Sequence, residues 1–403
     1  MTGWFGIIVA AMVVATTLAA WSRIYWRHIT STDRSLLRAN RIVRAGRWFR
    51  AGCARLLATV AAWPHVVEIA AGLPRASVPA TPSSVLWRSG PAVLRRYPSE
   101  RHTPGPPVLV VPSLVTRSWV LDLAPGRSLV AALLNAGHDV YLLDWGVPGP
   151  AEAGCGFDAY VATLMLAEQA VRQHSGQPEL HLVGYCLGGT LTLATHAALG
   201  DAGLASLTAI APSIDTAVAG RLGGLLRSPR LPPVLALDGH GLVPAPLIRE
   251  SFHWLRPIAL RTALVTWRSR RDPTWRATAG PLARWVWEQT PIPGALLFDL
   301  VDYARSNALR DGRWTVYGRP ARLESLNVPV MLAVAARDHI VPAPASYALS
   351  DRLRRPPRVV ECPAGHVAML AGASTHSILY RELLDFLAAA SAEQHRDQAN
   401  GER

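Results

Sequence analysis

The sequence predicts an α/β fold with a largely parallel sheet, because short apolar runs alternate with longer segments of helical periodicity. The runs are apolar almost throughout, as strands are when helices cover both faces of a sheet. They are PPVLVVP (106–112), HDVYLLDW (138–145), ELHLVGY (179–185), SLTAIAP (206–212), VPVMLAVAA (328–336) and PRVVECP (357–363). The helical segments are 126–136, 157–173 and 187–200. A chain of 403 residues can bury a substantial core.

The alternation stops over residues 219–324, which are helical in pattern and rich in tryptophan. An insertion at this place in a parallel sheet lies above the carboxyl edge, where ligands bind, and therefore predicts a lid or cap. A helical subdomain whose tryptophans serve only packing is the alternative. The α/β core is then 104–218 with 325–390, and the polar tail 391–403 is expected to be disordered. The tryptophans concerned are Trp254, Trp267, Trp275, Trp285 and Trp287.

Residues 1–22 are predicted to form a transmembrane anchor. The run from Thr2 to Ser22 is uncharged and about 20 residues long, which is what a helix needs to cross the hydrocarbon layer. Arg23 and Arg27 follow the run, and no arginine or lysine precedes it. The positive-inside rule therefore places the main domain in the cytoplasm. A cleaved signal peptide, which wants its positive charge first, and a buried hydrophobic hairpin are the alternatives.

Residues 23–103 are expected to form a basic arm and linker. The net charge of the chain is +13, and fourteen arginines against three acidic residues lie in the first 101 positions. The remainder is close to neutral, so charge gives no support for nucleic-acid binding by the main domain. The arm could lie on anionic lipid or be a solvated helical linker.

HLVGYCLGGT, residues 181–190, predicts a nucleophile elbow with Cys186 as the nucleophile. Gly184 and Gly188 flank the cysteine between a predicted strand and a predicted helix, where the turn is too tight for side chains. Gly189 lets the helix pack close to its strand. A thiol at a helix N-terminus favours the thiolate. A buried structural thiol is the alternative.

The partners of a nucleophile appear in the order that this kind of fold requires. Asp338 follows the run 328–336 and His366 follows 357–363, so both lie at carboxyl ends of predicted strands with Cys186. Asp338 could instead cap the turn after it, and His339 is a rival base, disfavoured because this loop holds the acid position. The oxyanion donors are expected to be the Leu187 amide and the Val115 amide, with Leu114 as the alternative to the latter.

Longer motifs indicate a family. The segment from PPVLVVPSLVTRSWV through LLDWGVP, then GYCLGG, ARSNALRDGRWTVYGR (304–319), DHIVP and GHVAML, resembles polyhydroxyalkanoate synthases over roughly residues 81–390. The shorter class III type is the most similar. The resemblance implies the α/β-hydrolase fold.

The resemblance also implies an activity. Cys186 would take a 3-hydroxyacyl group from a coenzyme A thioester, His366 would activate the thiol, and Asp338 would help to activate the chain-end hydroxyl. Acyl-coenzyme A is then the substrate, with no cofactor. A homodimer or a second synthase subunit, and a polyester granule, are the partners implied. The same triad could use water as the acyl acceptor, so a thioesterase, esterase or depolymerase is the alternative. A catalytically inactive scaffold that binds lipid or granule surfaces is a further alternative.

Two positions depart from the family pattern. Thr116 stands where synthases usually carry asparagine, and Glu288 stands at the acid position of WVWEQTPIP (285–293). The basic cluster 268–276 could meet the phosphates of the coenzyme or be a solvated surface. No histidine spacing indicates a metal. The cysteines suggest no disulfide framework; they are Cys53, Cys155, Cys186 and Cys362.

Overall fold

The computed structural model describes residues 78–99, 105–218, 220–228, 236–255 and 273–401. The chain divides after Ala61 into two units, and everything described belongs to the second. The predicted anchor (1–22) and most of the predicted arm therefore lie outside the described residues. Within the described residues, none of the helices is both long enough and apolar enough to span a bilayer.

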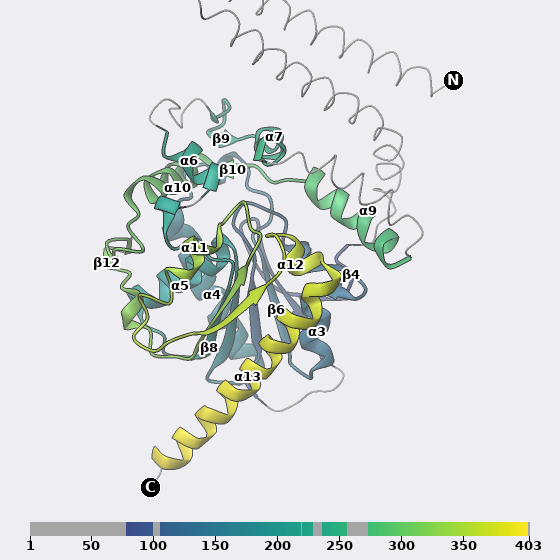
Figure 1. Ribbon diagram of the computed structural model, residues 1–403, viewed down its shortest axis with the longest axis vertical. Coiled ribbons are helices and arrows are strands. Elements are labelled where there is room, and N and C mark those ends of the chain that lie inside the picture. The colour runs from purple at the N-terminus through teal and green to yellow at the C-terminus, as the bar shows by residue number, and fades with distance from the viewer. Residues whose placement is uncertain (1–77, 100–104, 219, 229–235, 256–272, 402–403) are drawn as a thin grey trace, which may run out of the picture. The chain divides into compact units, whose positions relative to one another are not determined.

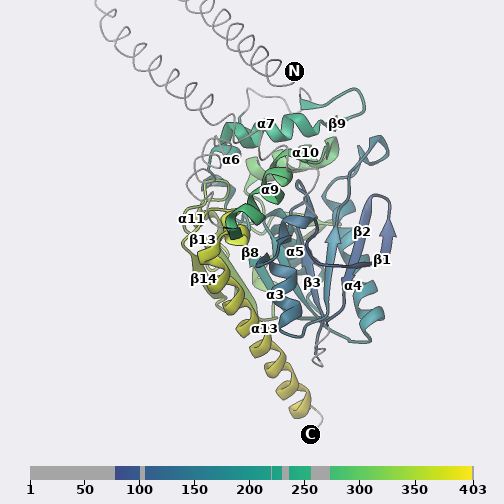
Figure 2. The same ribbon diagram turned by 90° about the vertical axis from the view of Figure 1, so that its right-hand side faces the viewer.

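One eight-stranded sheet organises the molecule, with its strands in the order β1-β2-β6-β3-β7-β8-β13-β14 (Figures 1 and 2). The strands from β6 to β14 pair in parallel, as predicted. The strands are β1 (Ser84–Ser89), β2 (Ala92–Tyr97), β3 (Val108–Val111), β6 (Val140–Asp144), β7 (Leu180–Tyr185), β8 (Leu204–Ile210), β13 (Val330–Ala335) and β14 (Arg358–Cys362).

The first two strands correct the expected boundary of the arm and linker at residue 103. β1 and β2 form an antiparallel hairpin, and β2 pairs antiparallel with β6. Leu94 and Tyr97 of β2 are fully buried. The hairpin escapes a search for apolar runs because Arg95 and Arg96 interrupt β2, which is buried only in part. It belongs to the core.

Helices cover both faces of the sheet, which confirms the predicted layers. Alternate residues of each strand face opposite sides: Leu109 and Val111 of β3 pack with α4 and α5, whereas Val108 and Val110 pack with α3 and α13. The core helices are α3 (Leu129–Asn135), α4 (Phe157–Ser175), α5 (Leu187–Leu199), α11 (Ala343–Tyr347), α12 (Ala368–Ala371) and α13 (Ala373–Gly401). Short elements between them are η2 (Ser118–Leu121), β4 (Asp122–Ala124), β5 (Arg127–Ser128) and η3 (Pro150–Glu152).

Residues 391–401 of the tail predicted to be disordered belong instead to helix α13, and residues 402–403 lie outside the described residues. The first half of this helix buries Leu383 and Leu387 in the core, and helix propagation from a packed start costs little. Ser391 Oγ lies 3.0 Å from Nε2 of His181 in β7, and Glu393 pairs with Arg355 at 2.9 Å. These contacts hold the polar residues in the helix.

The insertion follows β8 and ends before β13, and both views place its helices beyond one end of the sheet (Figures 1 and 2). Trp285 is buried, and Trp314, also in the insertion, packs against Phe157 and Tyr303. The side chains of Trp254, Trp267, Trp275 and Trp287 lie outside the described residues. Its elements are η4 (Thr216–Val218), α6 (Gly220–Leu226), β9 (Leu242–Val243), α7 (Ala245–Leu255), α9 (Pro273–Trp287), β10 (Ile292–Pro293), α10 (Gly294–Ser306), β11 (Thr315–Val316), β12 (Arg319–Pro320) and η6 (Leu323–Ser325).

Candidate active site

Cys186 occupies a sharp turn between β7 and α5. Its backbone has φ 56° and ψ −125°, a conformation that residues other than glycine rarely adopt. A Cβ atom on Gly184 would lie 2.5 Å from the Cα of Gly189, and one on Gly188 would lie 2.3 Å from the carbonyl oxygen of Pro112. The predicted elbow glycines are therefore needed because backbone passes within contact distance of both.

Asp338 and His366 meet at the same edge of the sheet. His366 Nδ1 lies 2.6 Å from Asp338 Oδ2. Asp338 Oδ1 accepts hydrogen bonds from the amides of Ile340 at 2.8 Å and Val341 at 2.9 Å. The two interpretations of Asp338, as partner of the histidine and as cap of its turn, are therefore compatible. One oxygen caps the turn, and the other binds the imidazole.

Cys186 lies close enough to the His366 ring to act on its pKa. Asp338 occupies Nδ1, which leaves Nε2 for the sulfur. Burial disfavours a charged ring, but the charges of Cys186 and Asp338 outweigh burial and raise the pKa of His366 to about 10. The site therefore favours a protonated His366 ring at neutral pH. Cys186 is only partly buried, unlike a sealed structural thiol.

Tyr185 belongs to the site although no sequence signal indicated it. Its ring lies 5.2 Å from that of His366, with the planes inclined by 38°, and its hydroxyl donates to the His366 carbonyl oxygen at 3.4 Å. Burial raises the pKa of Tyr185 well above its usual value, so it remains a neutral phenol. The contact depends on how the loop after β14 folds back over β7.

A cavity of about 450 Å³ lies between the insertion and the edge of the sheet that bears Cys186 and His366. Cys186 and His366 line it, as do Leu187 and Val115, the residues expected to supply oxyanion donors. Leu114, the alternative, is not among the lining residues. The insertion contributes a wall that is mostly apolar; its larger members are Leu225, Leu226, Val243, Leu247, Ile248, Trp285, Val286, Ile292, Leu297, Leu300 and Val301.

The remaining sequence candidates differ in their relation to this cavity. His339, the rival base, is not among the lining residues, although Ile340 from the same loop is. Thr116 lines the cavity. Glu288 does not and instead pairs with Arg284 at 2.8 Å. In the basic cluster, residues 268–272 and the side chains of 273–276 lie outside the described part of the chain.

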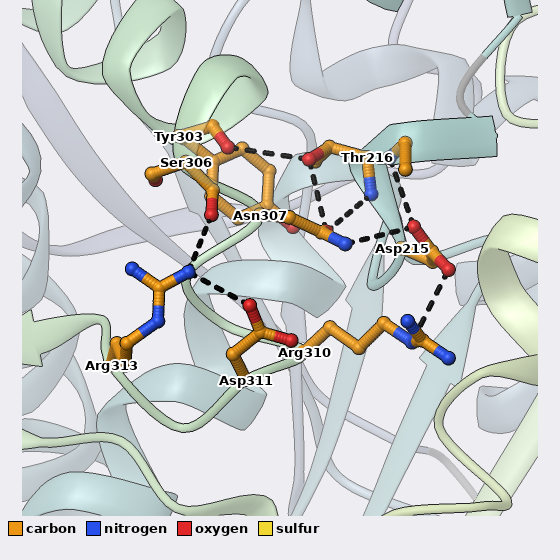
Figure 3. A network of polar contacts seen from close by, with 9 residues as sticks. Asp215, Thr216, Tyr303, Ser306, Asn307, Arg310, Asp311 and Arg313 are labelled. Carbon is orange, nitrogen blue, oxygen red and sulfur yellow. Dashed lines mark hydrogen bonds and ion pairs between the residues drawn. The ribbon is translucent and has the colours of Figure 1, made fainter.

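A polar network ties helix α10, which lines the cavity, to the loop after β8 (Figure 3). Asn307, which caps α10 in the left-handed region at φ 52°, accepts from the Thr216 amide at 2.8 Å and donates to Asp215 at 3.0 Å. Arg310 pairs with the other oxygen of Asp215 at 3.2 Å. Tyr303 donates to the carbonyl oxygen of Ser213. The network fixes the inner wall of the cavity to the sheet.

The elbow, the order of the triad and the sheet define the class of protein. Residues 106–373 match the family model described as alpha/beta hydrolase fold, and the chain belongs to that family. A candidate lipase from Sulfolobus solfataricus shares the fold, with 14% identity and a TM-score of 0.50 over 76% of this chain and 99% of that one.

Curated relatives narrow the comparison within the family. The chain is 28% identical to a poly(3-hydroxyalkanoate) polymerase subunit PhaC from Haloferax mediterranei, over 78% of this chain and 65% of the relative. It is 29% identical to one from Synechocystis sp., over 72% and 79%, and 31% identical to one from Cupriavidus necator, over 65% and 46%. The match thus spans less than two thirds of the Haloferax protein.

Proposed function

We propose that the protein is a polyhydroxyalkanoate synthase-type acyltransferase that moves 3-hydroxyacyl groups from coenzyme A thioesters to a growing polyester. The observation that carries the proposal is that Cys186 and His366 line one mostly apolar cavity, while Asp338 holds the His366 ring at 2.6 Å. The similarity to polymerases supports the choice of an alcohol as acceptor, because the triad by itself would serve water equally well.

In the first half-reaction, the Cys186 thiolate attacks the thioester carbonyl carbon. The carbonyl oxygen becomes an oxyanion, for which the amides of Leu187 and Val115 are the proposed donors. The Leu187 amide belongs to the first turn of α5, where amides have no partner within the helix. The bond to the coenzyme sulfur then breaks, and that sulfur leaves with the proton of the His366 imidazolium.

In the second half-reaction, a hydroxyl group attacks the acyl-cysteine. His366, now neutral, takes the hydroxyl proton while the new C–O bond forms and the C–S bond breaks, which restores the thiolate beside an imidazolium. The Asp338 side chain is wholly buried behind the ring, with both oxygens occupied. We propose that it assists the hydroxyl through His366 rather than by contact.

The test is incubation of the purified protein with 3-hydroxybutyryl-coenzyme A while thiol release and product size are followed together. A synthase releases coenzyme A and forms polymer. Release with free 3-hydroxybutyrate and no polymer would establish the hydrolase instead. Neither release nor acyl labelling of Cys186 would identify an idle scaffold. Cys186→Ala, which loses the nucleophile, is the negative control.

The size class and the partners are further parts of the proposal. The chain covers 79% of the Synechocystis relative but 46% of the Cupriavidus one, which favours a synthase of the shorter class III type. The relatives are named as polymerase subunits, which supports a second subunit as partner. Co-purification from the source cell, with a tag on this chain, tests for that subunit.

Membrane attachment rests on the sequence alone. We propose that residues 1–22 tether a cytoplasmic catalytic domain, close to the membrane or to a polyester granule. Cell fractionation tests this: the full chain is expected in the membrane fraction and a chain lacking residues 1–22 outside it. Equal distribution of the two would contradict the tether.

A further inference from the structure

Three polar atoms on the wall of the cavity have no hydrogen-bond partner among the described residues. They are Ser113 Oγ, Thr116 Oγ1 and Gln289 Oε1, which are buried atoms of residues that line the cavity holding Cys186. Ser113 and Gln289 are 2% and 6% exposed. Burying a polar atom without a partner is costly, and native structures rarely do so without a reason. Three such atoms on one wall indicate a ligand.

The orientation of the Gln289 amide follows from its partners. Its Nε2 donates to the carbonyl oxygen of Trp285 at 2.7 Å and to that of Val286 at 3.4 Å. Carbonyl oxygens only accept, so the nitrogen must face them. The oxygen Oε1 is therefore the free atom, and it requires a donor. A thioester carbonyl could not satisfy it, whereas a hydroxyl could.

The segments that carry these three residues are tied together, and we call Ser113, Thr116 and Gln289 the polar strip of the cavity. The Trp285 indole donates to the Arg117 carbonyl oxygen at 3.0 Å, and Arg117 Nε donates to the Glu288 carbonyl oxygen at 3.2 Å. These bonds join the loop 112–117 to the end of α9, beside Gln289. At its other end the same loop passes close to Gly188 of the elbow, where a Cβ atom would lie 2.3 Å from the Pro112 carbonyl oxygen. The strip thus runs from the nucleophile to the insertion.

We infer that this strip binds the hydroxyl of the 3-hydroxyacyl group, with Gln289 Oε1 as its acceptor and the Thr116 and Ser113 hydroxyls beside it. The inference rests on the proposed function. A 3-hydroxyacyl group carries one hydroxyl, two carbons beyond the carbonyl, on an otherwise apolar chain. The cavity matches this pattern, with one polar strip beginning at the nucleophile and apolar walls elsewhere. Gln289 is then a specificity-determining residue.

The experiment compares the rate of Cys186 acylation by 3-hydroxybutyryl-coenzyme A with that by butyryl-coenzyme A, which lacks the hydroxyl. The first turnover of coenzyme A release is measured, so chain growth does not enter. The wild type is expected to prefer the hydroxylated substrate. Gln289→Met, which keeps the size of the side chain, is expected to lower that preference about tenfold, chiefly by slowing the hydroxylated substrate.

Thr116→Val is the second variant, for use where Gln289→Met does not fold, and is expected to lower the preference several-fold. Gln173→Met on the exposed side of α4 is the matched control and should change neither rate. An unchanged preference in both variants, or an equal loss on both substrates, would overturn the inference and leave the acyltransferase standing. No release from either substrate by folded wild type would instead overturn the proposed function.

Discussion

Asp338 Oδ2 lies 2.6 Å from His366 Nδ1, while two backbone amides occupy the other oxygen of Asp338. The carboxylate cannot rotate away without losing those amide bonds, so the ring is held with Nδ1 protonated and Nε2 toward the sulfur. The acid thereby fixes the tautomer of the base and stabilises its charged form.

Asp338→Asn is expected to reduce acylation by about 10³- to 10⁴-fold, because an amide can present its NH₂ to Nδ1 and stabilise the wrong tautomer. The folded state should survive, since an asparagine oxygen can still cap the turn. First-turnover release of coenzyme A and a circular dichroism spectrum check the two statements. Activity within tenfold of wild type would mean that the carboxylate does not orient the ring.

The raised pKa of His366 makes a prediction about its titration. The ring should stay protonated through neutral pH and lose its proton as the pH rises through about 10. In Cys186→Ala the sulfur charge is gone while burial still opposes the charged ring, so the pKa should fall. NMR of ¹⁵N-labelled imidazole groups follows both proteins. A midpoint that does not move between them would show that the sulfur carries no charge.

The elbow can be tested at Gly188, where a Cβ atom would meet backbone oxygens at 2.3 and 2.5 Å. Gly188→Ala is expected to displace the loop 112–115, to abolish acylation and to cost at least about 2 kcal/mol of stability by overpacking. Gly224→Ala is the control, since nothing lies within 4 Å of its Cβ position. Denaturant unfolding and thiol release together check the pair; similar behaviour of the two variants would contradict the close approach.

A buried ion pair away from the site predicts how stability depends on pH. His196 Nε2 lies 3.0 Å from Glu168 Oε1, and both residues are at most 5% exposed. Burial lowers the pKa of His196, but the hydrogen bond and charge of Glu168 outweigh it, and the net pKa is raised above 6.5. The stabilisation is therefore complete below pH 6.5 and is lost as the pH rises through the raised value.

Glu168→Gln should lower the free energy of unfolding by about 3 kcal/mol at pH 6 and by less at higher pH, once the wild-type histidine has lost its proton. Glu382→Gln removes a partly exposed partner of Arg358 and should cost no more than about 1 kcal/mol. Urea unfolding at several pH values measures both. If Glu168→Gln lowers the free energy of unfolding by the same amount at every pH, protonated His196 is not the partner of Glu168.

The parallel strands and the placement of the three candidate triad residues could be predicted because their signals are local. Each strand is an apolar run, and Cys186, Asp338 and His366 each follow one directly. The hairpin β1–β2 was missed because it is half-buried and carries arginines, and the end of α13 because its polar residues are held by contacts with distant segments. Tyr185 and Gln289 are functional candidates only through loops that meet in space, which no spacing along the chain reveals.

The hydrogen bonds between Trp285, Arg117 and Glu288 have a mechanical consequence. Helix α9 and the loop bearing Val115 are fastened at two points, so they must travel as one piece. A displacement of α9 that keeps both bonds would therefore also displace the loop that bears a proposed oxyanion donor. The position of this part of the insertion and that of the proposed donor are thereby coupled through two hydrogen bonds.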